Sequence, residues 1–141
     1  MAPTEVLARQ HFKTISELAK SVGVNASILT GRDKGKNREK LLRGIADGKI
    51  SILVGTHALF QKDVEFNDLA LAVIDEQHRF GVHQRLMLTD KGEAADMLVM
   101  TATPIPRTLM LCAYSDLDSS RLTDKPSGRK SIETRARQIQ D

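Results

Sequence analysis

One stretch of the sequence decides the fold class: Leu69-Ala-Leu-Ala-Val-Ile74, followed at once by Asp75-Glu76-Gln77-His78. A short apolar run that ends abruptly in charge is typical of a strand buried on both faces of a parallel sheet. An acidic pair is costly to bury, so we expect Asp75 and Glu76 at the exposed end of this strand. The stretch therefore predicts an α/β domain with polar chemistry where a strand ends.

Working outward from this stretch, the same pattern recurs along the chain. Short apolar runs predict strands, and apolar residues at helical spacing between them predict helices, which together favour a mostly parallel sheet sandwiched by helices. The helix near the N-terminus is expected to begin after Thr4 and to end at Gly23. The predicted strands are Ala26–Leu29, Ile50–Val54, Leu69–Ile74, Met97–Met100 and Leu117–Leu122, and the predicted helices are Thr4–Val22, Asn37–Ala46 and Ile105–Tyr114.

Each of the first four predicted strands is followed by small, hydroxyl-bearing or charged residues. Parallel sheets bind their ligands at the carboxyl ends of their strands. We therefore expect these segments to form one rim that carries the function: Thr30-Gly31, Gly55-Thr56-His57, Asp75-Glu76 and Thr101-Ala102-Thr103.

The acidic pair fits phosphate chemistry. In α/β domains that handle phosphates, a first carboxylate such as Asp75 holds Mg²⁺ through water, because Mg²⁺ prefers oxygen ligands and keeps part of its hydration shell. A second carboxylate, Glu76, can orient and deprotonate the attacking water. His78 could then report the state of the phosphate. A lone acidic pair is more often a solvated turn, but the full string behind a strand is more specific.

Charge and cysteine content narrow the class of protein. The net charge is +3 over 141 residues, and residues 121–141 account for it with six basic and three acidic side chains. These basic groups permit phosphate contact, although a solvated helix face and a flexible linker explain them equally well. No apolar run reaches the ~20 residues of a membrane span. The single cysteine, Cys112, fits a reducing, cytoplasmic location and is expected in the core.

A second basic cluster comprises Arg32, Lys34, Lys36, Arg38, Lys40 and Arg43.

Four segments together resemble the motifs of superfamily 2 helicases. Asp75-Glu76-Gln77-His78 resembles the DExH box, and Thr101-Ala102-Thr103 resembles the motif that links ATP state to nucleic-acid grip. The opening residues 2–10 resemble motif Ia, and Val54-Gly55-Thr56-His57 resembles motif Ib, which touches the nucleic-acid backbone. Their order and spacing agree with that superfamily along the whole chain.

Longer strings are similar to the RecG type of helicase, which migrates branched DNA. They are Asp75-Glu-Gln-His-Arg-Phe-Gly-Val-His-Gln-Arg85, Gly55-Thr-His-Ala-Leu-Phe-Gln61 and Thr101-Ala-Thr-Pro-Ile-Pro-Arg-Thr108. Transcription-repair coupling factors share several of these strings. Gln77, where coupling factors usually carry Glu, and the opening Ala-Pro-Thr-Glu favour the RecG type.

This resemblance implies roles for particular residues. Asp75, Glu76 and His78 would be catalytic, with Asp75 holding Mg²⁺ through water, and Thr101 and Thr103 would couple ATP to DNA. Residues Thr4, Gly55, Thr56 and His57 would contact the DNA backbone; the alternatives are an N-cap for Thr4 and an ordinary turn for the others, and the intact order of the motifs favours contact. His11 lies on the apolar stripe of its helix and is expected to be a packed core histidine.

One part of the family pattern is missing from the chain. A helicase of this type needs a Walker A loop, G-x-x-x-x-G-K-[ST], and the 141 residues contain none. We therefore expect residues 1–123 to be part of a first, RecA-like motor domain without its Walker A strand and loop. Residues 124–141 are then a linker toward an absent second motor domain. The parent would be an ATP-dependent DNA helicase with ATP, Mg²⁺ and branched DNA as ligands. The chain alone should neither hydrolyse ATP nor bind nucleotide tightly.

Two further expectations follow. The resemblance implies that a Walker A strand pairs with the strand that ends at Met100. Without it, the edge of that strand is unpaired, and we expect the chain to self-associate through this edge. An alternative of a different class is a stand-alone, basic α/β module that binds nucleic acid and never meets ATP.

Overall fold

The computed structural model describes residues 1–76, 91–92, 95–103, 118–124 and 128. The chain divides into two compact units, Met1–Pro104 and Ile105–Asp141. The predicted helix Ile105–Tyr114, with Cys112, lies outside the described residues. Residues 118–122 form no strand, so the predicted strand Leu117–Leu122 is wrong there, and Leu122 is fully exposed rather than packed in a sheet. The predicted boundary between residues 123 and 124 stays a prediction.

The elements of the first unit follow the predicted order closely. The strands begin and end within two residues of their predicted limits, a difference that is usual because hydrogen bonding, not apolar sequence, defines the strand ends. One element was not predicted, the short 3₁₀ helix η1. The elements are α1 (Glu5–Ser21), β1 (Ala26–Leu29), α2 (Gly35–Ala46), β2 (Ile52–Gly55), η1 (His57–Phe60), β3 (Leu71–Ile74) and β4 (Asp96–Val99).

Helix α1 has the ends that its sequence predicts. The Thr4 hydroxyl accepts a hydrogen bond from the Leu7 amide at 3.3 Å, which is the geometry of an N-cap. The helix ends before Gly23, whose φ of 71° lies in the left-handed region that glycine tolerates best. Local chemistry therefore fixes both ends of this helix.

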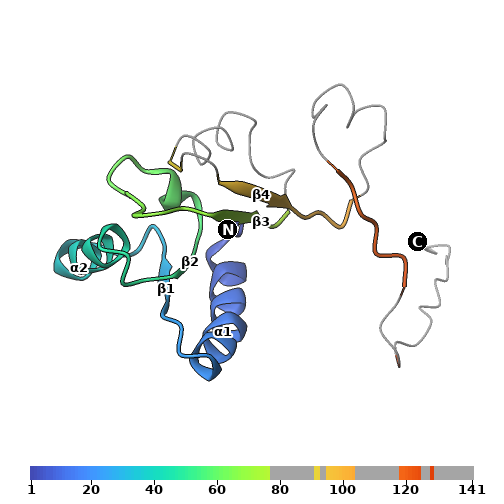
Figure 1. Ribbon diagram of the computed structural model, residues 1–141, viewed down its shortest axis with the longest axis horizontal. Coiled ribbons are helices and arrows are strands. Elements are labelled where there is room, and N and C mark those ends of the chain that lie inside the picture. Colours follow the sequence, from blue (N-terminus) through green and yellow to red (C-terminus); the bar gives the residue numbers. More distant parts are fainter. Residues whose placement is uncertain (77–90, 93–94, 104–117, 125–127, 129–141) are drawn as a thin grey trace, which may run out of the picture. The chain divides into compact units, whose positions relative to one another are not determined.

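The four strands form two parallel pairs. β1 pairs with β2, from Ala26 opposite Ile52 to Leu29 opposite Gly55. β3 pairs with β4, from Leu71 opposite Asp96 to Ile74 opposite Val99. All the described pairing is parallel, as the apolar strands predicted, and the carboxyl ends of each pair point the same way (Figure 1).

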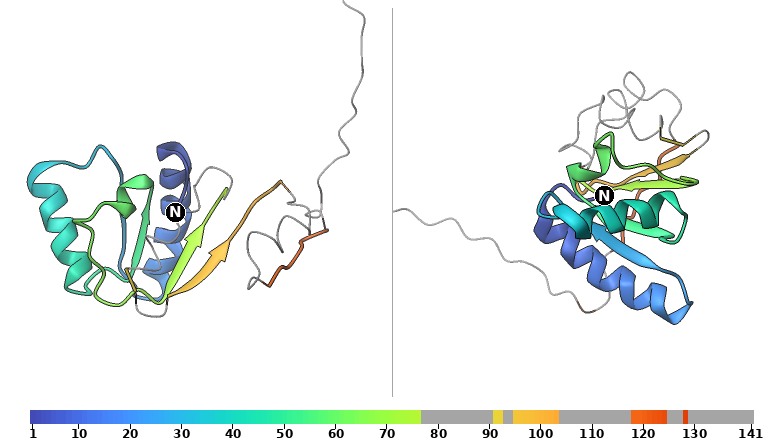
Figure 2. Two further views of the ribbon diagram at one scale, coloured as in Figure 1. Left: turned by 90° about the horizontal axis from the view of Figure 1, so that it is seen from above. Right: turned by 90° about the vertical axis from the view of Figure 1, so that its left-hand side faces the viewer.

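The first two residues of the chain join the two pairs. Ala2 donates a backbone hydrogen bond to Gly55 of β2 at 2.9 Å. Met1 donates its amine to the Val73 carbonyl of β3 at 2.6 Å and accepts from the Asp75 amide at 3.0 Å. Bonds to residues on either side of Ile74 are the pattern of a parallel ladder. Met1 and Ala2 thus link β2 to β3 through backbone hydrogen bonds, where the left view of Figure 2 shows the N-terminus.

Helices cover both faces of the β1–β2 pair because the strand side chains alternate between them. Ile28, Ile52 and Val54 pack against α1 through Ala8 and its neighbours. On the other face, Leu29 and Leu53 pack with η1 and with Leu41 and Leu42 of α2. A separate cluster beside β3 and β4 comprises Phe60, Ala72, Ile74, Met97 and Met1.

Candidate functional site

The acidic pair lies where β3 ends, as the sequence predicted. The Asp75 amide continues the ladder by donating to Met1, and its carboxylate is about a quarter exposed. Oδ2 of Asp75 lies 2.8 Å from Nε2 of His11 on α1. An ionised carboxylate only accepts hydrogen bonds, so the imidazole is the donor in this pair. The first carboxylate of the acidic pair is therefore held in place by a residue of α1 that lies 64 positions earlier in the sequence.

His11 differs from its expected role. The helical spacing with Leu7 and Ile15 correctly places it on the inner face of α1, but it is not a packed core residue, since 38% of its side chain is exposed. It reaches the end of β3 because it lies in the first half of α1, and α1 begins three residues after Ala2, which is bonded to the carboxyl end of β2. Periodicity shows which face a residue occupies but not which strand end it meets.

Glu76 turns the chain away from β3. Its φ of 54° lies in the left-handed region, which costs a residue with a side chain about 1 kcal/mol or more. Asp75 and Glu76 both lie in a bend, so the acidic pair departs from the extended path of β3. His78, the third predicted catalytic residue, lies outside the described residues.

The segment after β2 makes a tight turn into η1. A Cβ on Gly55 would lie 2.4 Å from the Leu29 carbonyl oxygen and 2.9 Å from two carbons of Leu59, so only glycine fits. The Thr56 carbonyl accepts from the Leu59 amide at 3.1 Å and starts the 3₁₀ turn. His57 meets Phe60 edge-on, with ring centroids 6.1 Å apart. The turn interpretation of these residues is correct, and their contact with DNA stays a prediction.

Two other predicted sites lie at the same edge of the fold. Thr4 follows Ala2 and caps α1, which confirms its structural role and leaves its phosphate contact a prediction. Thr101 and Thr103 follow β4, where the Thr101 hydroxyl accepts from the Thr103 amide at 3.2 Å. Met100, directly before them, donates to Ile74 at 2.8 Å.

The predicted rim therefore exists as a row of strand ends. Leu29 is level with Gly55, Gly55 is bonded to Ala2, and Met1 is bonded to Asp75. Bonding of Met100 to Ile74 then brings the segment that begins with Thr101 beside the acidic pair. Thr4, Gly55, Asp75 and Thr101 thus lie at successive positions along one edge of the first unit.

Asp75 and Glu76 are the carboxylates at this edge that could hold a Mg²⁺ ion. The described part of the chain contains no group of three or more His, Cys, Asp or Glu side chains that could hold a metal ion. Mg²⁺ usually keeps several waters and takes one or two carboxylates, which Asp75 and Glu76 can supply. The groups that would hold nucleotide phosphates from the other side belong to a Walker A loop, and the sequence has no such string.

Part of the basic cluster has a structural role. Arg38 of α2 makes a fork of hydrogen bonds to both carboxylate oxygens of Asp63, and it also donates to Gln61 at 2.6 Å. Arg32 lies 3.0 Å from Glu5 at the start of α1. These two cations are paired with acids, and contact of the cluster with phosphate stays a prediction.

Sequence reasoning missed two buried or half-buried cations. Burial lowers the pKa of the Met1 amine below its ordinary value of 8.0, and the nearby charge of Asp75 opposes this shift. Lys91 donates to the carbonyls of Gln61 and Val64 at 2.9 and 2.6 Å, and burial lowers its pKa as well. Neither residue belongs to a motif. No described helix is long and apolar enough to cross a membrane.

Comparison with known proteins agrees with this geometry. The chain is 54% identical over 138 residues to the ATP-dependent DNA helicase RecG of Pasteurella multocida, 52% identical over 134 residues to that of Bacillus subtilis, and 50% identical over 138 residues to that of Escherichia coli K12. Each comparison covers 95% of this chain and 20% of the relative, so the chain spans about a fifth of the length of these curated relatives.

The profile of the DEAD/DEAH box helicases matches residues 1–111, which include all four strands and the whole rim. That match covers more than half of the chain and includes the acidic pair at the end of β3 together with the segments on either side of it. With this row of strand ends and this match, the chain belongs to the DEAD/DEAH box helicase family.

Proposed function

We propose that this chain is the DExH-box part of an ATP-driven DNA helicase that unwinds and migrates forked or four-way DNA. One observation carries the proposal: the acidic pair lies at the end of a parallel strand, level with the segments after β2 and β4. This arrangement lets one edge of the sheet serve both phosphate chemistry and a polynucleotide backbone. The names of the relatives, ATP-dependent DNA helicase RecG, support the same class of activity.

In this proposal, the acidic residues divide the chemistry between them. Asp75 would hold Mg²⁺ through water, and His11 would keep its carboxylate in one orientation. Glu76 would accept a proton from the water that attacks the terminal phosphate of ATP. Bound Mg²⁺ would neutralise charge on the phosphates. His78 would relay the state of the site, and Thr101 and Thr103 would couple it to DNA.

The DNA-facing residues would act through backbone contacts. Thr4, Thr56 and His57 offer hydroxyl or imidazole groups along the same edge, and Gly55 allows a close approach because it has no side chain. Such groups bind phosphate oxygens without reading sequence. We infer that branched DNA is the substrate class and that the protein acts in the cytoplasm. The second inference rests on the resemblance and on the single cysteine.

A second candidate is a basic module that binds nucleic acid without ATP, and the net charge of +3, which lies in residues 121–141, favours it. A transfer experiment separates the two. Residues 1–141 would replace the matching segment of the Pasteurella multocida relative, and DNA-stimulated ATP hydrolysis would be measured. We expect the chimera to hydrolyse ATP and to lose at least about 100-fold of its rate with Glu76→Gln. A chimera that folds and binds DNA, but whose ATP hydrolysis is insensitive to Glu76→Gln, would refute the proposed role.

Binding of DNA by the chain itself is tested by fluorescence anisotropy on a forked oligonucleotide. We expect weak, sequence-independent binding that falls steeply between low and moderate salt, because phosphate contacts release counterions. Deleting residues 125–141 should remove much of it, since this segment has five basic and two acidic residues. Affinity that does not change with salt would rule out phosphate contacts. The chain alone should show no ATP hydrolysis above background.

A further inference from the structure

Lys91 is a half-buried cation that the proposed chemistry does not use. It lies between β3 and β4 in the sequence, and its ammonium donates to the carbonyls of Gln61 and Val64 at 2.9 and 2.6 Å. Burial lowers the pKa of Lys91, and the charges of Asp63 and Glu65 oppose this shift. Removing an ammonium from water is costly unless polar partners replace the water. The two carbonyls are therefore specific partners of this cation.

Both carbonyls belong to the turn that follows η1, residues 61–64. The Val64 amide closes this turn by donating to the Gln61 carbonyl at 3.1 Å. Lys91 bonds the first and the last carbonyl of the turn, so it bridges both of its ends. A second cation, Arg38 of α2, donates to the side chains of two residues of the turn. We call residues 61–64 the clasped turn, because two cations from different parts of the chain hold it.

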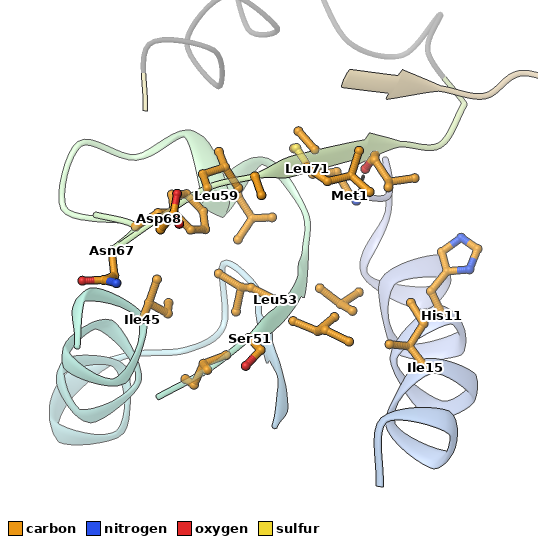
Figure 3. A pocket seen from close by; sticks show the side chains of 18 of the residues that line it. Met1, His11, Ile15, Ile45, Ser51, Leu53, Leu59, Asn67, Asp68 and Leu71 are labelled. Carbon is orange, nitrogen blue, oxygen red and sulfur yellow. Dashed lines mark hydrogen bonds between the residues drawn. The ribbon is translucent and has the colours of Figure 1, made fainter. Parts of the chain in front are cut away.

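The clasped turn is packed together with η1. Val64 is fully buried in one cluster with Leu29 of β1 and with Ala58 and Leu59 of η1. Leu59 also lines an apolar cavity of about 700 Å³ that borders both β2 and β3 (Figure 3). A close-packed interior transmits displacements, so we expect a shift of the clasped turn to move η1 with it.

Helix η1 also carries the groups that are proposed to contact DNA. The Thr56 carbonyl starts its first turn by accepting from the Leu59 amide, and exposed His57 is its first residue. The position of η1 therefore determines where the Thr56 hydroxyl and the His57 ring lie at the rim. Phosphate contacts act only over hydrogen-bond distances, so these groups can share one DNA backbone with Thr4 only if η1 keeps its place.

The segment that carries Lys91 is fixed to the other strand pair. A Cβ on Gly92 would lie 2.8 Å from the Leu69 carbonyl oxygen, so the backbone here lies directly against the residues before β3. The Asp96 amide then donates to the Ala70 carbonyl at 2.9 Å as β4 begins. Lys91 thus links the clasped turn, which packs with β1, to the β3–β4 pair, in which β3 ends at the acidic pair.

From these contacts we propose that Lys91 is a positioning residue for DNA binding. Its ammonium fastens the clasped turn to the β3–β4 pair, and this holds η1, with Thr56 and His57, at a fixed place relative to the acidic pair. The inference rests on the proposed function, since it needs Thr56 and His57 to contact DNA. Lys91 itself contacts no phosphate in this proposal and acts through η1.

Three variants of the chain test this proposal. Lys91→Met keeps a long side chain and removes its charge and its donors, whereas Lys91→Arg keeps both. Lys62→Met is the matched control, because Lys62 is an exposed lysine of the same turn that makes no hydrogen bond or ion pair with any described residue. Amide exchange is measured without DNA. Fluorescence anisotropy on a forked oligonucleotide is measured over a series of salt concentrations.

In Lys91→Met, we expect the amides of Leu59 and Val64 to exchange at least about tenfold faster than in the unaltered chain, because their hydrogen bonds close η1 and the clasped turn. The Ala8 amide of α1 should change little, and it reports any loss of overall stability. Exchange in Lys62→Met and in Lys91→Arg should match the unaltered chain. Equal exchange of the turn amides in Lys91→Met and the unaltered chain would overturn the proposal.

Affinity for the forked oligonucleotide should fall at least about threefold further in Lys91→Met than in Lys62→Met, although each variant removes one positive charge. Lys91→Arg should restore the affinity. The slope of log affinity against log salt in Lys91→Met should stay that of the unaltered chain, because Lys91 contacts no phosphate. A slope that is shallower by about 0.9 would mean that Lys91 contacts a phosphate directly, and would also overturn the proposal.

The outcomes separate this inference from the proposed function. If the unaltered chain binds no DNA, the proposed function fails and the inference fails with it. If the unaltered chain binds DNA, and Lys91→Met binds it as tightly as Lys62→Met does, only the inference fails. Lys91 would then stabilise the clasped turn without positioning any contact to DNA.

Discussion

Nε2 of His11 lies 2.8 Å from Oδ2 of Asp75, so a helix near the N-terminus is tied to the first carboxylate of the DExH string. The contact joins α1 to the end of β3, and it is the one described side-chain hydrogen bond between these two elements. Both side chains are partly exposed, which limits the strength of the pair.

We predict that the two residues are energetically coupled. His11→Ala and Asp75→Ala should each lower the free energy of unfolding by about 1 kcal/mol, and the double variant should cost less than their sum. Urea denaturation of the four proteins in this cycle measures the coupling. Lys13→Ala, on the exposed face of α1, is the control and should change little. Strict additivity would mean that the contact contributes nothing.

Gly55 is predicted to tolerate no side chain. Gly55→Ala places a methyl group 2.4 Å from the Leu29 carbonyl oxygen, and the backbone of β1 cannot yield as a flexible side chain would. The free energy of unfolding should fall by about 2–3 kcal/mol. Gly31→Ala is the matched control, because nothing lies within 4 Å of its added methyl group. Chemical denaturation with similar losses for both variants would contradict this prediction.

Arg38 and Lys36 lie near each other in α2 but should behave differently. Arg38 holds Asp63 and Gln61, and only 16% of its side chain is exposed, so Arg38→Ala should lower the unfolding free energy by about 1 kcal/mol. Lys36 is exposed, so replacing it should affect DNA binding but not the free energy of unfolding. Anisotropy at low salt should show weaker binding for Lys36→Ala, and binding by Arg38→Ala should be unchanged. Weaker DNA binding by Arg38→Ala, with unchanged binding by Lys36→Ala, would mean that Arg38 contacts the DNA.

Stability should depend on pH through the Met1 amine. Burial lowers the pKa of this amine in the folded chain below its ordinary value of 8.0, so the unfolded chain binds more protons between those two values. The free energy of unfolding therefore rises with pH across that window and levels off above pH 8. Urea midpoints from pH 6 to 9 measure it. An N-acetylated chain should lack this rise, and an identical rise in both proteins would assign it to other groups.

The outer edge of β4 is predicted to support self-association. The Asp96 and Met100 amides donate to β3, so the Val99 amide between them faces outward. Val99→Pro removes this outward donor and spares the bonds to β3, and we expect light scattering to show a weaker concentration dependence of the mass. Val99→Thr keeps the donor and is the control. A chain that stays monomeric at high concentration would refute the prediction.

The sequence predicted most of the first unit because its elements have strong local signals. α1 has a hydroxyl cap, an apolar stripe and a terminal glycine, and the four strands are apolar runs with polar ends. η1 was missed because His57-Ala58-Leu59-Phe60 contains no turn residue and only four residues. The backbone bonds of Met1 and Ala2 to β2 and β3 were missed because two residues have no period, and these bonds join residues more than 50 positions apart.

The sequence predicted where the candidate site lies, but it did not predict which side chains contact one another there. The predicted strand ends correctly placed Asp75, Gly55 and Thr101 at one edge of the fold, because the carboxyl ends of parallel strands share one edge. The partner of Asp75 was missed, since the path of α1 over the sheet is a tertiary feature that the stripe containing His11 does not encode. Likewise, the pairing of Arg38 with Asp63 was missed, because the two residues lie 25 positions apart and no local pattern links them.

The junction at Met1 and Ala2 also bears on how the first unit unfolds. The β1–β2 half has its own core against α1 and α2, and the β3–β4 half has a separate cluster around Ile74. Met1 packs against clusters in both halves. Cooperativity is transmitted only through groups that both halves share. Met1 and the short helix η1 contribute to clusters in both halves, so we expect unfolding of one half to spread into the other through these residues.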